Sequence, residues 1–212
     1  MRTIDLETWP RRVHFNFYKD MDMPHFNLTA NVDITAFYPI VKQRKLSFTV
    51  ALLYLLARAA NEIFEFRLRI EGDQLVEYEV VHPSTTILIN DDIFSFCLFE
   101  YVENFSEFSI KAAEQIEYVK SNLMLEDEPD VNKYLFMTSI PWVSFTSMMH
   151  PISLNPADSV PRICWGKFFK EGETMKMPLG VQAHHAVMDG IHMGRYFIRV
   201  QEYLDQPEDV LV

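Results

Sequence analysis

The sequence predicts an α+β fold in which helices pack on a mixed β-sheet. Short segments of alternating apolar and polar residues, which are typical of strands, recur along the 212 residues. Longer segments with helical apolar spacing interrupt them irregularly, and this order favours an α+β arrangement over a regular alternation of strand and helix. No repeat, low-complexity tract or Gly/Ser-rich linker divides the sequence, so we expect one domain over residues 1–212.

The first elements follow from alternation and from capping residues. Apolar residues alternate with polar ones from Phe26 to Val32, which predicts a strand. Thr35 is expected to cap a helix that ends near Arg44. Ser47 is expected to cap the apolar helix at 48–60, because a hydroxyl oxygen accepts a hydrogen bond from the free N–H groups at a helix start.

The middle of the sequence predicts a hairpin, two further strands and a long helix. Strand patterns at 66–70 and 76–80 flank Gly72-Asp73, a dipeptide typical of tight turns. The elements that follow are strands at 85–89 and 94–101 and an amphipathic helix at 105–123.

The last third of the sequence predicts three strands and a final helix. Gly172 lies in a tight connection between the last two strands, and the helix begins after Asp189-Gly190. The polar tail from Asp205 is expected to fray. The three strands are predicted at 138–146, 163–169 and 175–184.

Composition and charge restrict the partners. Hydrophobic residues make up 49% and charged residues 23% of the sequence, as in soluble globular proteins. The formal net charge of −11 argues against nucleic acid and anionic membranes as partners. The N-terminus lacks the apolar core of a signal peptide, and the run at 48–60 is shorter than the roughly 20 residues that span a bilayer. We therefore expect a cytoplasmic protein in which Cys97 and Cys164 are free thiols.

The segment 184–190, His-His-Ala-Val-Met-Asp-Gly, is the strongest functional signal. A histidine takes a proton from a hydroxyl near neutral pH because its ordinary pKa is about 6.5. An aspartate four residues later, where a strand passes into a helix, can hold the local backbone through an ion pair. A metal site formed by both histidines and Asp189 is disfavoured, because adjacent side chains on a strand face opposite ways.

This segment and several others resemble the chloramphenicol acetyltransferase family. The pattern HHxxxDG is shared with lipoyl-domain acyltransferase cores and peptide condensation domains, so it indicates CoA-dependent acyltransferases in general. Residues 141–147, Pro-Trp-Val-Ser-Phe-Thr-Ser, and 33–35, Asp-Ile-Thr, point to the chloramphenicol acetyltransferases. The other matching segments, in the family's order and near its spacing, are 5–12, 14–18, 28–35 and 177–182.

The resemblance implies a two-layer sandwich fold and a homotrimer with each active site at a subunit interface. It also implies acetyl-CoA as co-substrate, no metal, and direct acetyl transfer to a small-molecule acceptor, with chloramphenicol first. His185 matches the family's general base. Ser147 matches the serine whose hydroxyl stabilises the tetrahedral intermediate. The sequence contains no Gly-x-Ser-x-Gly, which disfavours a Ser–His acyl-enzyme mechanism.

The resemblance also assigns supporting residues. Asp189 and Arg11 match an ion pair that shapes the family's active site without moving protons. The acceptor pocket is matched by Phe17, Tyr18 and Phe94, and the vicinity of the CoA nucleotide by Lys167 and Phe168.

Several acceptor positions depart from the family pattern. Phe96 replaces a small residue, and Cys164 replaces a threonine thought to hold a water in the family's site. Residues 148–151, Met-Met-His-Pro, replace Phe-x-Leu-Asn. Two alternatives therefore stay open: another small hydroxyl or amine compound as the acceptor, or a catalytically inactive trimer that sequesters a hydrophobic ligand. Turnover of acetyl-CoA with a panel of acceptors distinguishes them.

Overall fold

The main sheet is mixed, as predicted. The computed structural model describes residues 1–122, 130–154 and 156–212. Seven strands among these residues form the sheet in the order β2-β10-β8-β7-β5-β6, with β9 paired to β10. Strand β7 runs parallel to β5 and β8, and the other pairs are antiparallel. The strands are β2 (His25–Asp33), β5 (His82–Leu88), β6 (Phe94–Leu98), β7 (Tyr134–Ile140), β8 (Arg162–Gly166), β9 (Phe169–Glu171) and β10 (Thr174–His184).

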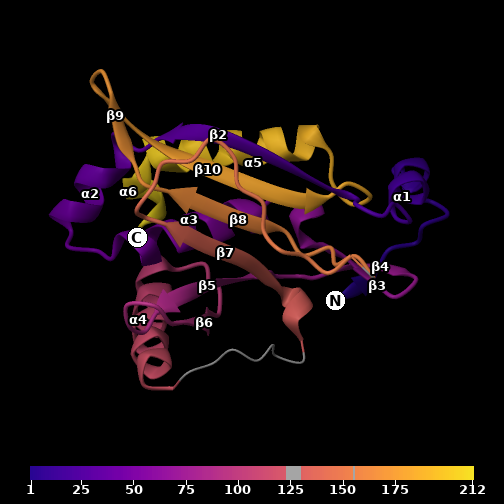
Figure 1. Ribbon diagram of the computed structural model, residues 1–212, viewed down its shortest axis with the longest axis horizontal. Helices are drawn as coiled ribbons and strands as arrows, with labels where there is room; N and C mark the ends of the chain where they lie inside the picture. Colours follow the sequence, from indigo (N-terminus) through magenta and orange to yellow (C-terminus); the bar gives the residue numbers. More distant parts are fainter. Residues whose placement is uncertain (123–129, 155) are drawn as a thin grey trace.

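Helices cover one face of this sheet (Figure 1). Helix α5 contacts β2, α3 contacts β5, and α4 contacts β5 and β6. The hydrophobic core lies between the sheet and these helices, which gives the expected two layers. The helices are α1 (Arg12–Tyr18), α2 (Phe37–Gln43), α3 (Phe48–Asn61), α4 (Phe105–Ser121), α5 (Gly190–Asp205) and α6 (Pro207–Val210), with short 3₁₀ helices η1 (Phe64–Arg67) and η2 (Val131–Lys133).

The apolar run at 48–60 forms helix α3 in the core. Ser47 Oγ accepts a hydrogen bond from the N–H of Val50 at 3.4 Å, so the predicted cap is present. Every residue from Leu52 to Leu56 is fully buried, and each large side chain of this kind contributes roughly 1.5–3 kcal/mol of burial free energy. None of the described helices combines the length and the apolar character that a membrane span requires.

A small sheet holds the N-terminal residues beside the main sheet (Figure 1). The predicted hairpin turn is present, and Gly72 there has a φ of 58°, which glycine adopts without a Cβ clash. Arg69 is fully buried and donates to the carbonyl oxygens of Asn132 and Tyr134, so it ties the hairpin to the start of β7. Burial lowers the pKa of Arg69 to about 9. The strands, in the order β1-β4-β3, are β1 (Arg2–Thr3), β4 (Gln74–Glu77) and β3 (Leu68–Glu71).

The two faces of the main sheet carry different residues. On the helix side, β10 buries its odd-numbered residues from Met177 to Ala183 in the core. Its even-numbered residues, among them Gln182 and His184, face the other way. Asn27 and His25 of β2 lie opposite these two in the strand register. The second face is therefore polar, and it positions the candidate site.

Several predicted element ends were wrong. The strand predicted at 163–169 is divided between β8 and β9, and the strand predicted at 94–101 is β6, which ends at Leu98. Thr35 does not cap α2; its Oγ1 instead accepts a hydrogen bond from the N–H of Met175 at the end of the β2–β10 pair. The strand predicted at 138–146 is β7, which ends at Ile140. The reason is that the next residue, Pro141, has no N–H to donate to a neighbouring strand.

The C-terminal tail was also predicted wrongly. It does not fray, because Val210 and Leu211 are buried in the core and Arg44 donates to the carbonyl oxygen of Leu211 at 2.8 Å. The predicted helix at 105–123 is α4, which ends at Ser121, and residue 123 lies outside the described residues.

Candidate active site

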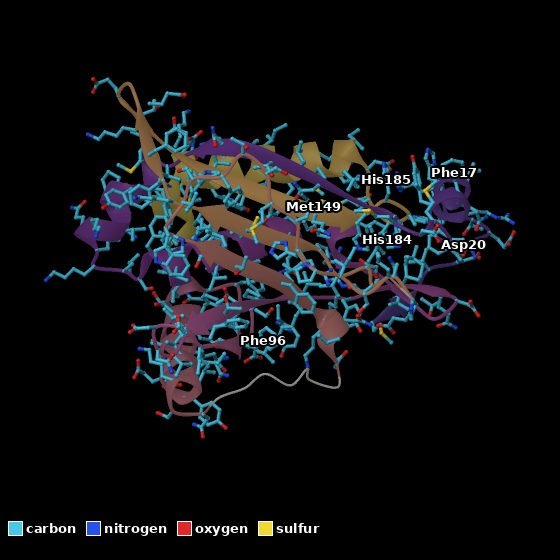
Figure 2. All side chains as sticks on the ribbon, in the orientation of Figure 1. Phe17, Asp20, Phe96, Met149, His184 and His185 are labelled. Carbon is cyan, nitrogen blue, oxygen red and sulfur yellow. The ribbon has the colours of Figure 1, made fainter. Side chains whose placement is uncertain are left out.

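His185 lies immediately after β10, against two aromatic rings. The ring of Tyr18 stacks on it with centroids 4.0 Å apart and planes 2° apart, and the ring of Phe26 lies 4.5 Å away. The backbone N–H of His185 donates to the carbonyl oxygen of Pro24 at 2.8 Å. The side chain is 30% exposed, and Figure 2 shows it close to helix α1. The imidazole is therefore held in orientation yet accessible to a small molecule.

The structure brings Asp189 and Arg11 together as an ion pair. Nη1 of Arg11 donates to Oδ2 of Asp189, and the side chains are 15% and 24% exposed. Burial alone would raise the pKa of Asp189, but the hydrogen bond and the charge of Arg11 outweigh burial and hold this pKa below its ordinary value. Oδ1 lies 3.0 Å from Nδ1 of His185 without the alignment of a hydrogen bond. An ionised carboxylate thus faces Nδ1 and leaves Nε2 of His185 available.

Sequence analysis did not identify two residues that support this turn. Nδ1 of His192 accepts a hydrogen bond from the backbone N–H of Asp189 at 2.9 Å, and its Nε2 lies 3.2 Å from Oε1 of Glu65. Burial lowers the pKa of His192 more than the charge of Glu65 raises it. The contact fixes the backbone of Asp189 at the start of α5. The sequence did contain one sign of this contact: His192 stands three residues after Asp189, the spacing of a capping box at a helix start.

His184 turns away from His185. Its ring lies 5.1 Å from the ring of His25, and its Nδ1 accepts a hydrogen bond from the N–H of Ala186 at 3.2 Å. Burial lowers the pKa of His184 to about 4, so this side chain is neutral at pH 7. Among the described residues, no cluster of His, Cys, Asp and Glu is arranged to hold a metal ion.

Ser147 lies on an irregular segment, 141–151, that crosses the polar face of the sheet. Gly166 admits this segment. A Cβ on Gly166 would come within 2.9 Å of both the ring of Phe145 and the carbonyl oxygen of Val143, closer than real Cβ contacts allow. The same ring also lies over Gly180, at 3.8 Å from where a Cβ would stand, an ordinary contact distance. Ser147 itself is exposed.

Two side-chain amides hold the segment just after Ser147. The N–H of His150 donates to Oε1 of Gln182 at 2.8 Å. The amide nitrogen of Asn27, in the orientation that satisfies both of its polar atoms, donates to the carbonyl oxygen of Met148 at 3.1 Å. Sequence analysis did not identify either amide, because nothing in the sequence shows which loop crosses a strand.

The predicted catalytic pair does not meet within one chain. Among the described residues, no hydrogen bond, ion pair or ring contact joins Ser147 to His185. Figure 2 shows Met149, two residues after Ser147, over the middle of the sheet and His185 at its end.

The predicted acceptor residues fall into two groups. Phe17 is 64% exposed on α1, and its ring lies 4.9 Å from that of Tyr18, beside His185. Phe94 and Phe96, with rings 5.9 Å apart, line a cavity of about 390 Å³ on the polar face over β5, β7 and β8. Within one chain, the first group therefore lies beside His185 and the second lines a separate cavity.

Cys164 lies apart from both groups. A Cβ on Gly180 would come within 2.7 Å of its Sγ, and the side chain is buried. Burial raises the pKa of the Cys164 thiol to about 11. Cys97 is buried as well, and both cysteines are free, which confirms that prediction.

Lys167 and Phe168 lie at the opposite end of the main sheet from His185, next to β9 (Figure 1). The ring of Phe168 packs against Tyr38 and Phe48 at centroid distances of 5.1 Å and 5.9 Å. Nζ of Lys42 lies 5.5 Å over the Tyr38 ring. Sequence analysis did not identify Tyr38 or Lys42, since they come from a helix distant in sequence. Flat rings and ammonium groups together suit a nucleotide with phosphates.

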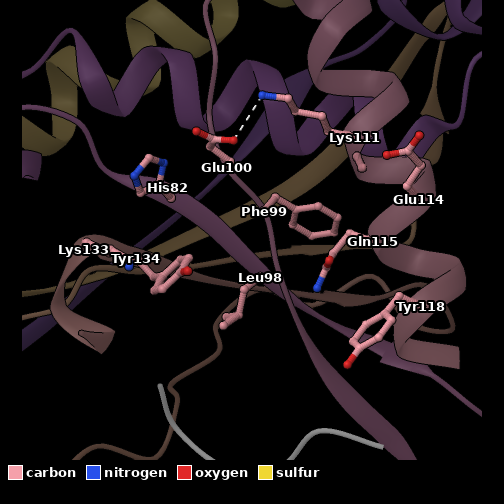
Figure 3. A pocket seen from close by; sticks show the side chains of 11 residues that line it. His82, Leu98, Phe99, Glu100, Lys111, Glu114, Gln115, Tyr118, Lys133 and Tyr134 are labelled. Carbon is pink, nitrogen blue, oxygen red and sulfur yellow. Dashed lines mark hydrogen bonds and ion pairs between the residues drawn. The ribbon is translucent and has the colours of Figure 1, made fainter. Parts of the chain in front are cut away.

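A separate cavity of about 770 Å³ lies between α4 and the strands β5 and β6 (Figure 3). Its two lysines are paired: Lys111 with Glu100 at 3.1 Å, and Lys133 with Asp130 at 3.6 Å. Nδ1 of His82 accepts a hydrogen bond from the N–H of Tyr101. The lysines and the histidine that the structure describes in its lining are thus already engaged.

Comparisons with known proteins agree with this geometry. The family model described as chloramphenicol acetyltransferase matches residues 1–201. Chloramphenicol acetyltransferases from Klebsiella sp and Escherichia coli are each 33% identical over 205 residues, which cover 96% of this chain and 94% of each relative. One from Bacillus pumilus is 35% identical over 192 residues, covering 90% of this chain and 87% of that protein.

Comparison with solved structures also finds similar proteins. A chloramphenicol acetyltransferase structure superposes with a TM-score of 0.86 at 26% identity and covers 96% of this chain and 100% of that chain. A probable dihydrolipoamide acetyltransferase from Listeria monocytogenes shares the fold, with a TM-score of 0.67 at 13% identity over 92% of this chain and 89% of that chain. Since the family model and the relatives each match most of its length, the chain belongs to the chloramphenicol acetyltransferase family.

Proposed function

We propose that this protein is a cytoplasmic, acetyl-CoA-dependent O-acetyltransferase that acetylates a hydroxyl group of chloramphenicol by direct transfer. The observation that carries the proposal is the environment of His185. Its imidazole is stacked on Tyr18 at 4.0 Å, its Nδ1 faces the ionised Asp189, and its Nε2 is left for a substrate proton. A fixed imidazole with one engaged side is the arrangement that general-base catalysis requires.

In this mechanism, Nε2 of His185 takes the proton from the acceptor hydroxyl as its oxygen attacks the carbonyl carbon of the thioester. A C–O bond forms, the C–S bond breaks, and the departing thiolate receives the proton back from His185. The hydroxyl of Ser147 donates a hydrogen bond to the oxygen that carries negative charge in the intermediate. Asp189 stabilises the protonated imidazole while Arg11 holds the carboxylate in place.

The active site is proposed to form between subunits of a homotrimer. Its support is the separation of Ser147 from His185 within one chain, together with exposed apolar residues on the Ser147 segment and on α1 beside His185. Phe17 is 64% exposed, Trp142 68% and Met149 49%, and such a group is typical of a subunit contact. A second copy would bring the Ser147 segment of one subunit to the His185 of another.

The CoA nucleotide is proposed to bind at Phe168 and Lys167. The ring cluster with Tyr38 and Phe48 provides a stacking surface, and Lys42 and Lys167 provide charge for phosphates. This local basic patch is needed because the chain as a whole carries a net charge of −11.

The test is thiol release from acetyl-CoA with and without chloramphenicol. Chloramphenicol-dependent release with formation of O-acetylchloramphenicol is the expected result. Thiol release with other hydroxyl or amine compounds but not with chloramphenicol would show that the acceptor is a different compound and that the reaction is still acetyl transfer. Binding of chloramphenicol without any release would favour an inactive trimer that sequesters a hydrophobic ligand.

A further inference from the structure

The cavity beside Phe94 and Phe96 has a polar end that sequence analysis did not foresee. Its walls include the rings of Phe94, Phe96 and Phe136, and His150 also lies in the lining. Both ring nitrogens of His150 are buried and have no hydrogen-bond partner among the described residues. The backbone of His150 is fixed through its N–H to Gln182. A buried imidazole with both nitrogens unpaired is costly in free energy unless a bound molecule or water completes its hydrogen bonds.

The charge of the cavity is already compensated. Arg162 also lines it, but its two terminal nitrogens each lie 2.7 Å from an oxygen of Asp158. Its guanidinium carbon lies 5.3 Å over the ring of Phe136. Burial, and then the charge of Arg162, lower the pKa of His150 to about 4, so its imidazole is neutral at pH 7. The site therefore offers a neutral donor and a neutral acceptor, and no free charge.

The floor of the cavity adds one more donor. Thr86 Oγ1 and Thr138 Oγ1 lie 3.3 Å apart, on neighbouring strands of the polar face. Two hydroxyls that share one hydrogen bond leave one O–H free to donate. Aromatic walls therefore surround a small group of neutral hydrogen-bonding atoms.

We propose that His150 is a specificity-determining residue of this cavity, whose neutral imidazole pairs with a hydrogen-bonding substituent on the acceptor's ring. The inference rests on the proposed acetyl transfer, because it assigns a residue that recognises the acceptor of that same reaction. The rings of Phe94 and Phe136 hold the acceptor's ring, Phe96 limits the space beside it, and His150 pairs with the polar substituent. A site built around unpaired polar groups rejects an analogue that lacks the partner group.

The experiment compares three acceptors that share the chloramphenicol side chain and differ only at the para position of the ring: nitro, methylsulfonyl and tert-butyl. The tert-butyl group is close to methylsulfonyl in shape and volume but has no hydrogen-bonding atom. We expect kcat/KM of the wild type for the tert-butyl compound to be about tenfold below that for the methylsulfonyl compound, mainly through KM. In His150→Leu this ratio should fall below about threefold, and His150→Asn, which keeps a neutral donor and acceptor, should restore part of it.

Two controls separate this inference from the proposed function. Ile110→Leu changes an exposed residue of α4 outside the cavity lining and should leave the ratio unchanged. Calorimetric binding of the three acceptors to the resting enzyme gives the selectivity without turnover. If the enzyme binds the three compounds selectively but acetylates none of them, the proposed acetyl transfer is contradicted and recognition by His150 is still supported. Equal binding of the three compounds, or a ratio that survives His150→Leu, would overturn the role of His150 whatever the turnover.

Discussion

Asn27 and Gln182 lie directly opposite each other in the β2–β10 register, and both hold the segment that carries Ser147. Gln182 accepts the N–H of His150, and Asn27 donates to the carbonyl oxygen of Met148. Gln182 is 1% exposed, so its hydrogen bond is made in a water-poor setting. Two amides on adjacent strands thus fix the loop one and three residues after the proposed oxyanion donor. We assign them as positioning residues.

Gln182→Met should lower kcat about ten- to a hundredfold with a smaller change in KM. The substitution keeps the volume but leaves the N–H of His150 unpaired, and a displacement of about 1 Å in a reacting group costs on the order of 10²-fold in rate. Ser147→Ala alone should lower kcat by about 10²–10³-fold, the effect of losing one oxyanion donor. Steady-state kinetics of both variants and of the double variant measure these effects.

The double variant decides how Gln182 acts. If Gln182 acts by placing Ser147, the double variant should be no slower than Ser147→Ala, because the two changes remove one function. Asn31→Ala, an exposed change on the neighbouring strand β2, is the control and should keep wild-type rates. Losses that multiply in the double variant would show that Gln182 acts independently of Ser147.

His185→Ala should abolish nearly all turnover while the assembly persists. General-base catalysis contributes about 10²–10⁴-fold, and His185 also orients the attacking hydroxyl. Thiol-release kinetics measure the loss, and light scattering follows the oligomer. His14→Ala, a change of an exposed histidine on α1, is the control. Wild-type rates in His185→Ala would remove the assignment.

Much of the fold was predictable because it depends on local patterns. The strand at β2, the capped helix at α3 and the hairpin turn at Gly72 each follow from neighbouring residues. Thr35 and Pro141 show the limit of such patterns. The hydroxyl of Thr35 accepts a hydrogen bond from the N–H of Met175, which is far away in sequence. Strand β7 ends before Pro141, because proline has no N–H to donate.

The candidate site was predictable only where a motif carries it. His185, Asp189 and Arg11 are found through the resemblance, and the structure adds that Tyr18 stacks on the imidazole. Gln182 gave no signal, since a glutamine in a strand is usually a solvated side chain. Its role depends on a loop that crosses the sheet 32 residues away in sequence.

Arg11 and Asp189 should act as a unit in stability. Arg11→Met and Asp189→Asn should each lower Tm, because each leaves a mostly buried charge without its partner. The double variant should lose less than the sum of the two. A thermal-shift cycle at neutral pH measures the coupling, and strict additivity would contradict it. The same cycle on the exposed pair Arg12–Glu7 is the control, with a coupling of at most about 1 kcal/mol.

The pH dependence of this pair has a definite sign. The pKa of Asp189 lies below its ordinary value in the folded protein. Its contribution is therefore complete above the unfolded pKa of about 3.9 and is lost as the pH falls through the lower folded pKa. The difference in free energy of unfolding between wild type and Asp189→Asn should shrink below about pH 4, as urea titrations between pH 3 and pH 7 would measure. A difference that grows on acidification would show that Asp189 is not stabilised as a carboxylate.

Phe96 should restrict the acceptor cavity for chloramphenicol. Its ring lines the cavity of about 390 Å³ and lies 5.9 Å from that of Phe94, where the family has a small residue. Phe96→Ala should therefore lower the KM for chloramphenicol several-fold and leave kcat nearly unchanged, since space for binding changes while His185 does not. Steady-state kinetics test this, with Ile93→Ala, an exposed change in the same hairpin outside the cavity lining, as the control. An unchanged or higher KM in Phe96→Ala would mean that the ring contributes contacts to the acceptor and does not exclude it.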